Sequence, residues 1–255
     1  MAESNTENAF RSAFKQPDPT PYLLKLIESN PELPTIADLV FVYMDLVAES
    51  PKQIYKYAEA LASVRKSTIT VAGGDRLGNP AQQNIGHAFN DVFVEFHSTD
   101  LDDVNDKSVT PSNEFLVASL ISAVSMLYKF CDSPAQVGGL LRGLHFDDEK
   151  NYADDVSSRE ILVLGACLQL LVAGSYLYGP KGTDVGRVDV LGELERIKGA
   201  GVVKDRNGQR LLAVCDNFGS IFYTTQNYSR LRCNKLNLVS RVMSVMLGAS
   251  YFHKR

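Results

Sequence analysis

The chain has 255 residues, enough for one large domain or two small ones. Its composition, 45% hydrophobic and 22% charged, is that of a globular protein and excludes a disordered or fibrous one. The formal net charge of −4 hides a strong asymmetry. Residues 201–255 carry nine Lys or Arg against two Asp, a net charge of +7, so the first 200 residues together carry −11. Charge separation on this scale bears on binding partners rather than on fold.

Cysteine usage and the start of the chain indicate a compartment. The first ten residues are polar and lack the basic start and apolar run of a signal peptide. The cysteines are widely spread and form no Cys-x-x-Cys pair, which disfavours a disulfide framework and favours a reducing compartment. We therefore expect a cytoplasmic protein. The four cysteines are Cys131, Cys167, Cys215 and Cys233.

The first 19 residues form a polar arm that ends in Pro17-Asp18-Pro19. Because this arm has little apolar surface to fix it, we expect it to be mobile or to dock on a partner. After it, capping residues followed by apolar residues at spacings of three and four predict successive helices that start near residues 20, 35, 51, 85 and 110. A β-prone run at 67–72 interrupts them. We assign residues 20–180 to one helical domain.

The segment 157–178 is predicted to be the central helix of that domain. Ser157 followed by Glu160 has the spacing of a capping box, and no charged residue occurs between 161 and 179. A helix that is apolar all round belongs inside another structure, either a protein core or a bilayer. The central Gln169, the small residues beside it and the lack of a flanking basic cluster favour a protein core. The predicted fold is a mainly α bundle around this buried helix.

Residues 181–255 are predicted to be a small α+β region. Apolar spacing indicates a helix at 189–198. Asn207-Gly208 lies between two β-prone runs, the strongest short signal for a β-hairpin, so we expect a hairpin over 202–214. A third strand at 220–225 and a last helix at 236–247 complete the region.

No pattern in the chain specifies catalysis. The glycine-rich loop 73–80 matches neither a P-loop nor a dinucleotide fingerprint. The acidic loop 147–155 lacks the glycine and the final glutamate of an EF-hand, and no histidine pairs with another ligand at metal-binding spacing. We therefore predict no catalytic residue, no metal site and no cofactor.

The most informative stretch is 218–235, where aromatic residues alternate with polar ones and are followed by cations. Bases stack on aromatic rings, and clustered cations neutralise phosphates. This pattern is typical of a surface for single-stranded nucleic acid, with RNA favoured. Cations on the predicted hairpin and in the last helix extend it. The candidate binding residues are Arg206, Arg210, Tyr223, Tyr228, Arg230, Arg232, Lys235 and Arg241.

These features predict a non-enzymatic structural protein that self-associates and binds single-stranded nucleic acid, as coat and nucleocapsid proteins do. An acidic region and a basic region on different parts of one chain suit head-to-tail contacts between copies. Two alternatives remain. The chain is a helical adaptor for another protein if the aromatics are core residues and the arginines pair with its own acids. It is an enzyme if a site lies between the helical domain and the C-terminal region.

Overall fold

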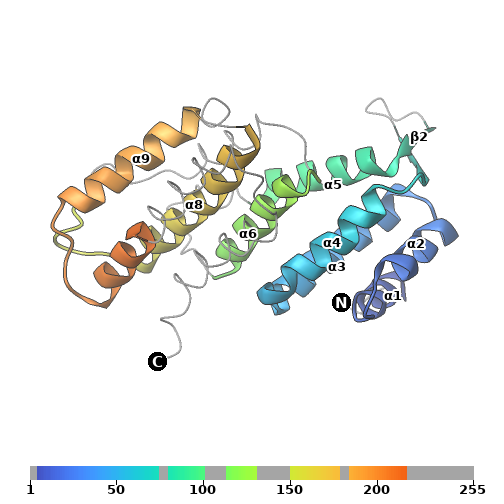
Figure 1. Cartoon of the computed structure of the whole chain (residues 1–255), viewed down its shortest axis with the longest axis horizontal. Helices are drawn as coiled ribbons and strands as arrows, with labels where there is room; N and C mark the ends of the chain where they lie inside the picture. The colour runs from blue at the N-terminus through green and yellow to red at the C-terminus, as the bar shows by residue number, and fades with distance from the viewer. Residues whose placement is uncertain (1–4, 75–79, 101–112, 131–149, 179–183, 217–255) are drawn as a thin grey trace. The chain divides into compact units, whose positions relative to one another are not determined.

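The structure is a computed structural model that describes residues 5–74, 80–100, 113–130, 150–178 and 184–216 (Figure 1). These residues are mainly helical and include a small two-stranded sheet, which confirms the predicted mainly α class with a β-hairpin. The chain separates into two compact units. The first is Met1–Phe96 with Tyr128–Asp132, and the second is His97–Leu127 with Ser133–Arg255. The domain boundary we placed at residue 180 does not coincide with this division.

The described elements are mostly helices. Those that lie in or begin in the first unit are α1 (Asn5–Phe14), α2 (Thr20–Ser29), α3 (Leu33–Glu49), the 3-10 turn η1 (Pro51–Gln53), α4 (Ile54–Arg65), β1 (Thr70–Gly74), β2 (Pro80–Asn84) and α5 (Ile85–Asp100). Those of the second unit are α6 (Asn113–Leu127), α8 (Ser158–Tyr178), α9 (Asp184–Gly199) and helical residues 206–216.

The prediction of a loose N-terminal arm is wrong for residues 5–14, which form α1. Phe10 and Phe14 lie one helical turn apart and are both buried as α1 packs against α2 and α3. The ring of Phe14 also meets Tyr57 of α4 edge-on, with 5.4 Å between ring centroids. The guanidinium of Arg11 donates to Asp45 and Glu49 of α3, at 2.8 Å each. Two buried aromatic rings and two ion pairs therefore hold the helix on its own chain.

Among the described residues, the hairpin lies at 70–84 and not at 202–214. β1, which overlaps the β-prone run predicted at 67–72, pairs antiparallel with β2, and Thr70 faces Asn84 at one end of the register. The backbone N–H of Ala72 also donates to the carbonyl of Pro31 at 2.7 Å, which ties β1 to the segment before α3. β2 has the sequence PAQQN, which has little strand propensity of its own, so its pairing with β1 supplies the structure.

Aromatic side chains fill part of the core of the first unit. Tyr43 of α3 meets Phe93 of α5 edge-on, with 6.3 Å between ring centroids. Phe93 and Phe89 of α5 both lie against Phe130, at 5.3 and 5.9 Å between centroids. All four side chains are buried. Aromatic pairs at these distances stabilise a core beyond the area that they bury.

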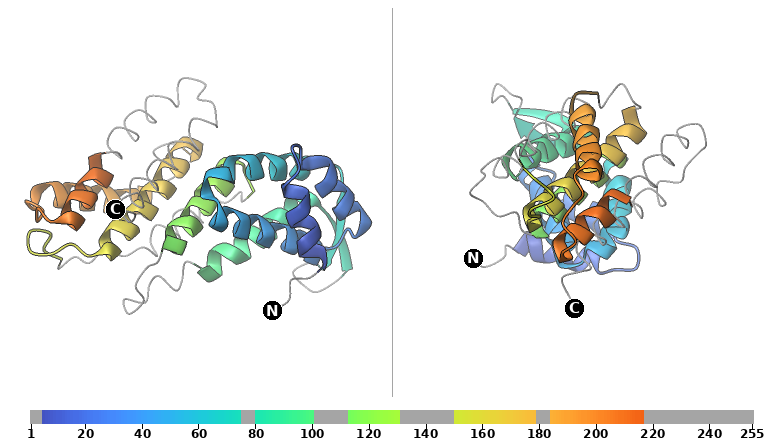
Figure 2. Two further views of the ribbon diagram at one scale, coloured as in Figure 1. Left: turned by 90° about the horizontal axis from the view of Figure 1, so that it is seen from below. Right: turned by 90° about the vertical axis from the view of Figure 1, so that its left-hand side faces the viewer.

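In the second unit, α8 is the buried helix that the sequence predicted. Ile161 to Leu164 are four consecutive buried residues, so all sides of the helix are covered over that turn. α8 packs mainly along α6 and also contacts α9 (Figure 1 and Figure 2). In the α6–α8 contact the hydroxyl of Ser119 donates to the side-chain oxygen of Gln169 at 2.5 Å, and both residues are fully buried. None of the described helices combines the length and hydropathy needed to cross a bilayer.

The predicted hairpin over 202–214 is wrong, because residues 206–216 are helical. The carboxylate of Asp205 accepts the backbone N–H of Gly208 at 2.7 Å, which satisfies a free donor in the first turn of the helix. Gly208 is needed for close packing, since an added Cβ would overlap the carbonyl oxygen of Val203. The Asn-Gly pair therefore belongs to a capped helix start, and its glycine permits a close approach instead of a hairpin turn. The strand expected at 220–225 and the helix expected at 236–247 lie outside the described residues.

Candidate functional site

Two of the eight predicted nucleic-acid-binding residues fall within the described part of the chain. They are Arg206 and Arg210, one turn apart in the helical segment 206–216. The other six lie outside the described residues: Tyr223, Tyr228, Arg230, Arg232, Lys235 and Arg241.

Arg206 and Arg210 have different environments. Arg206 is exposed, as a phosphate-binding cation needs to be, whereas Arg210 is only 4% exposed and its guanidinium donates to the side chain of Asn207 at 3.3 Å. Burial, together with the positive charge of Arg206, lowers the pKa of Arg210. The expectation that both arginines lie on the surface of a hairpin is therefore wrong, because both lie in a helix and Arg210 is buried.

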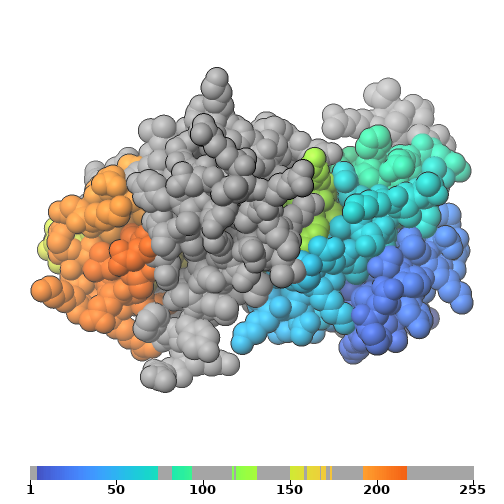
Figure 3. Space-filling model, viewed as in Figure 1, coloured from blue at the N-terminus to red at the C-terminus, as the bar shows by residue number. Residues whose placement is uncertain are grey.

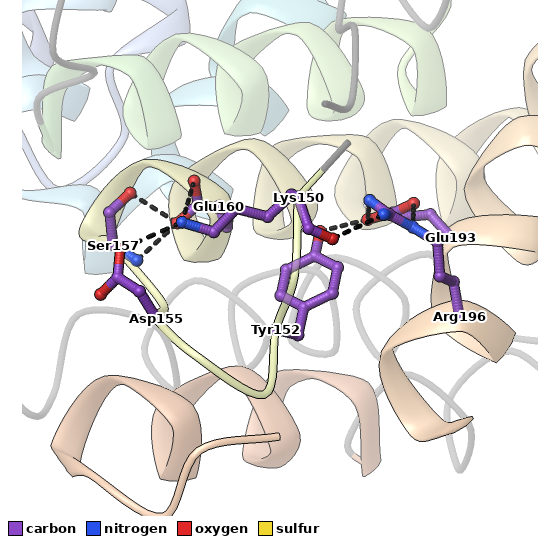
Figure 4. Close-up of polar contacts among 7 residues, drawn as sticks. All are labelled: Lys150, Tyr152, Asp155, Ser157, Glu160, Glu193 and Arg196. Carbon is purple, nitrogen blue, oxygen red and sulfur yellow. Dashed lines mark hydrogen bonds and ion pairs between the residues drawn. The ribbon is translucent and has the colours of Figure 1, made fainter. Parts of the chain in front are cut away.

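The most developed polar network of the described residues lies in the second unit and centres on Tyr152 (Figure 4). Its ring is buried, and its hydroxyl donates to the buried carboxylate of Glu193 on α9. Arg196, one turn along α9, donates to the same carboxylate through two nitrogens, at 2.9 Å each. A third nitrogen of Arg196 donates to the backbone carbonyl of Lys150 at 2.8 Å, and its guanidinium carbon lies 5.0 Å from the centre of the Tyr152 ring.

A second set of contacts joins the same segment to the start of α8 (Figure 4). The amino group of Lys150 lies 3.1 Å from a carboxylate oxygen of Asp155 and 3.6 Å from one of Glu160. Glu160 also accepts the backbone N–H of Ser157 at 2.5 Å, which is the glutamate half of the capping box that the sequence predicted. Lys150 therefore supplies a positive charge next to a carboxylate that is already engaged in capping the central helix.

The segment 150–157 is thus attached to three elements of the second unit. Tyr152 connects it to α9 through Glu193, and Glu160 connects it to α8. A backbone hydrogen bond of 3.0 Å from the N–H of Val203 to the carbonyl of Tyr152 connects it to the segment before residues 206–216. The network therefore fixes the position of the segment 150–157 against α8, α9 and the chain just before residues 206–216.

The protonation states of this network suit attachment rather than proton transfer. Burial and the hydrogen bond to Glu193 raise the pKa of Tyr152 well above the usual range of a phenol, so it stays neutral. Burial lowers the pKa of Lys150, but its contacts with Asp155 and Glu160 outweigh that effect and raise it overall. The hydrogen bonds to Glu193 likewise raise the pKa of Arg196. All three groups hold one charge state across the physiological pH range.

Sequence reasoning did not single out Tyr152, Glu193 or Arg196. The sequence offered two local signals for this network. One is a tyrosine within an acidic loop, and the other is a Glu–Arg pair three residues apart on a predicted helix. Their contact joins residues 41 apart in the chain, and no local pattern indicates which partner a buried tyrosine meets.

Within the described ranges, no group of three or more His, Cys, Asp or Glu side chains is arranged to hold a metal ion. Comparisons of the chain with protein-family models, with curated proteins and with solved structures found no match.

Proposed function

We propose that this chain is a non-enzymatic structural protein of the cytoplasm that self-associates and binds single-stranded nucleic acid, with RNA favoured, through its C-terminal region. The observation that carries the proposal is the net charge of +7 over residues 201–255, against −11 for the rest of the chain. Within that region Tyr223 and Tyr228 precede Arg230, Arg232 and Lys235 closely. Cations bind phosphates and aromatic rings stack on bases, and both interactions tolerate any sequence.

The described beginning of this region has properties that agree with the proposal. Lys204 and Arg206 are exposed, and the charge of Arg206 acts unfavourably on the nearby Arg210. Like charges that are held close together favour an anion in their neighbourhood. A phosphate backbone that passes this point would reduce the repulsion. Because Arg210 is buried, it adds only to the positive potential. The direct phosphate contacts are assigned to Arg206 and to Arg230, Arg232, Lys235 and Arg241.

Fluorescence anisotropy with a labelled oligouridine tests the proposal at low salt. We expect Arg230→Ala combined with Arg232→Ala to raise the dissociation constant about tenfold, since two phosphate contacts are lost. The matched control is Lys15→Ala combined with Lys25→Ala, which removes the same charge from exposed positions of the first unit. No binding by the wild-type chain, or an equal loss in both double variants, would contradict the proposal.

The absorbance spectrum of the purified protein separates this function from that of a protein adaptor. A nucleic-acid-binding chain carries host RNA and absorbs strongly near 260 nm until it is treated with nuclease and the fragments are removed. An adaptor shows a clean protein spectrum before and after the same treatment.

A further inference from the structure

One face of α3 carries an exposed aromatic ring among carboxylates. Phe41 is 54% exposed, and Asp45, also exposed, lies one turn further along. Asp38 lies one turn before it and Glu49 one turn after Asp45. Spacings of three and four residues place these side chains on one face of a helix. We call Asp38, Phe41, Asp45 and Glu49 the α3 stripe.

Helix α1 borders the α3 stripe and adds further charge. Arg11 of α1 pairs with Asp45 and Glu49 at 2.8 Å, which accounts for one positive charge. Glu7 of α1 acts on Asp38, whose pKa is raised by burial and by that neighbouring carboxylate. Four carboxylates and one guanidinium therefore lie along this edge. The excess of negative charge favours binding of a cationic partner. In Figure 3 the N-terminal part of the chain, in blue, lies at the molecular surface.

We infer that the α3 stripe binds the basic C-terminal region, residues 201–255, of a second copy of the chain. This inference rests on the proposed function, because it identifies the acidic partner surface of the proposed self-association. The charges are complementary, with an excess of carboxylates on the stripe and +7 on the C-terminal region. The aromatic residues of that region, including Tyr223 and Tyr228, provide apolar surface for Phe41.

The exposed ring of Tyr22 on α2 shows why Phe41 in particular is assigned this role. Tyr22 is 53% exposed, so exposure alone does not distinguish the two rings, and single exposed apolar residues are common on protein surfaces. The difference is the charge beside them. Tyr22 has Lys25 three residues after it and Asp18 four residues before it, so these charges offset each other, whereas Phe41 lies between two aspartates. A basic partner is therefore attracted to Phe41 and not to Tyr22.

The contact joins two different surfaces, so each copy still has a free stripe and a free C-terminal region for further copies. Head-to-tail contacts of this kind produce rings or open filaments. Because exposed charges drive it, association should weaken as salt rises. Association is measured after nuclease digestion, because the same cations are proposed to bind nucleic acid and bound RNA would compete with the stripe.

Sedimentation velocity of the full chain over a wide range of concentrations tests the inference. Phe41→Lys replaces the apolar contact with a like charge and should raise the dissociation constant for self-association at least tenfold, roughly the loss expected for an interface anchor. Tyr22→Lys makes the same change at an equally exposed ring and should alter it less than about twofold. Adding Arg230→Glu and Arg232→Glu to Phe41→Lys should restore association. Circular dichroism checks helicity, and Phe41→Ser applies the same test if the lysine variant does not fold.

Equal effects of Phe41→Lys and Tyr22→Lys on the association of the chain would overturn the inference but leave the proposed function intact. A wild-type chain that stays monomeric at every concentration would overturn both the inference and the proposed self-association. Oligouridine binding, measured by anisotropy on the same samples, reports separately on the nucleic-acid part of the proposal.

Discussion

Replacing Glu193 by alanine removes the carboxylate on which Tyr152 and Arg196 converge. The Tyr152 hydroxyl would then be buried without its acceptor, which costs about 1–3 kcal/mol. Breaking a buried ion pair by removing one partner costs about 3–5 kcal/mol. The Arg196 side chain is 31% exposed, so water replaces part of the lost contact and the value lies toward the lower end. We expect Glu193→Ala to destabilise the second unit by about 3 kcal/mol.

Urea unfolding followed by circular dichroism measures this loss, and circular dichroism is preferred because the chain has no tryptophan. Tyr152→Phe, which leaves no buried donor behind, should cost about 1.5 kcal/mol. The control is Glu195→Ala, at a carboxylate that is 75% exposed and pairs with Lys198, where we expect less than about 0.5 kcal/mol. In the Glu193→Ala background Tyr152→Phe should recover part of the loss, because it removes the buried hydroxyl that has no acceptor. A Glu193→Ala loss no larger than that of Glu195→Ala would refute the reasoning.

Three further changes are measured by the same unfolding assay. Ser119→Ala should cost about 1–2 kcal/mol, because it leaves the buried oxygen of Gln169 without its donor; an unchanged midpoint would contradict that. Gly208→Ala should cost roughly 2 kcal/mol despite the better helix propensity of alanine, since its Cβ meets the Val203 carbonyl. Asp38→Asn should stabilise the chain by about 0.5 kcal/mol at pH 7, because burial and a neighbouring carboxylate raise the pKa of Asp38 and disfavour its charged form. That gain should fade as the pH falls through this pKa, where the wild-type carboxyl is protonated as well.

The buried central helix was predictable because its signals are local. An apolar run without charged residues indicates burial on all sides, and Glu160 three residues after Ser157 indicates where the helix starts. The structure has both features, with α8 spanning Ser158–Tyr178. The partner of Gln169 was not predictable, since Ser119 lies 50 residues away and only tertiary packing brings the two together.

Two of the wrong assignments, the C-terminal hairpin and the loose N-terminal arm, have distinct physical causes. Asn207-Gly208 is a strong hairpin signal, but Asp205 caps a helix at the same place and Gly208 is used for close packing. The composition of the N-terminal arm is polar when it is averaged over the whole segment. Phe10 and Phe14 nevertheless lie one helical turn apart, and both are buried. The average composition of a segment does not indicate whether two apolar residues share a helical face, whereas their spacing does.

The candidate site was only partly predictable from the sequence. Charge counts along the chain identify the basic C-terminal region, but they do not give the orientation of a side chain. Arg206 and Arg210 look equivalent in sequence and lie one turn apart on the same helix, yet one is exposed and the other buried. Tertiary packing decides this difference, and helical spacing does not reveal it.

The salt dependence of oligouridine binding by the nuclease-treated chain tests the nucleic-acid proposal most directly. If Arg206, Arg230, Arg232, Lys235 and Arg241 all contact phosphates, the logarithm of the binding constant should fall against the logarithm of salt concentration with a slope of about −3.5. Binding that is absent at low salt, or that has a slope near zero, would contradict the proposal.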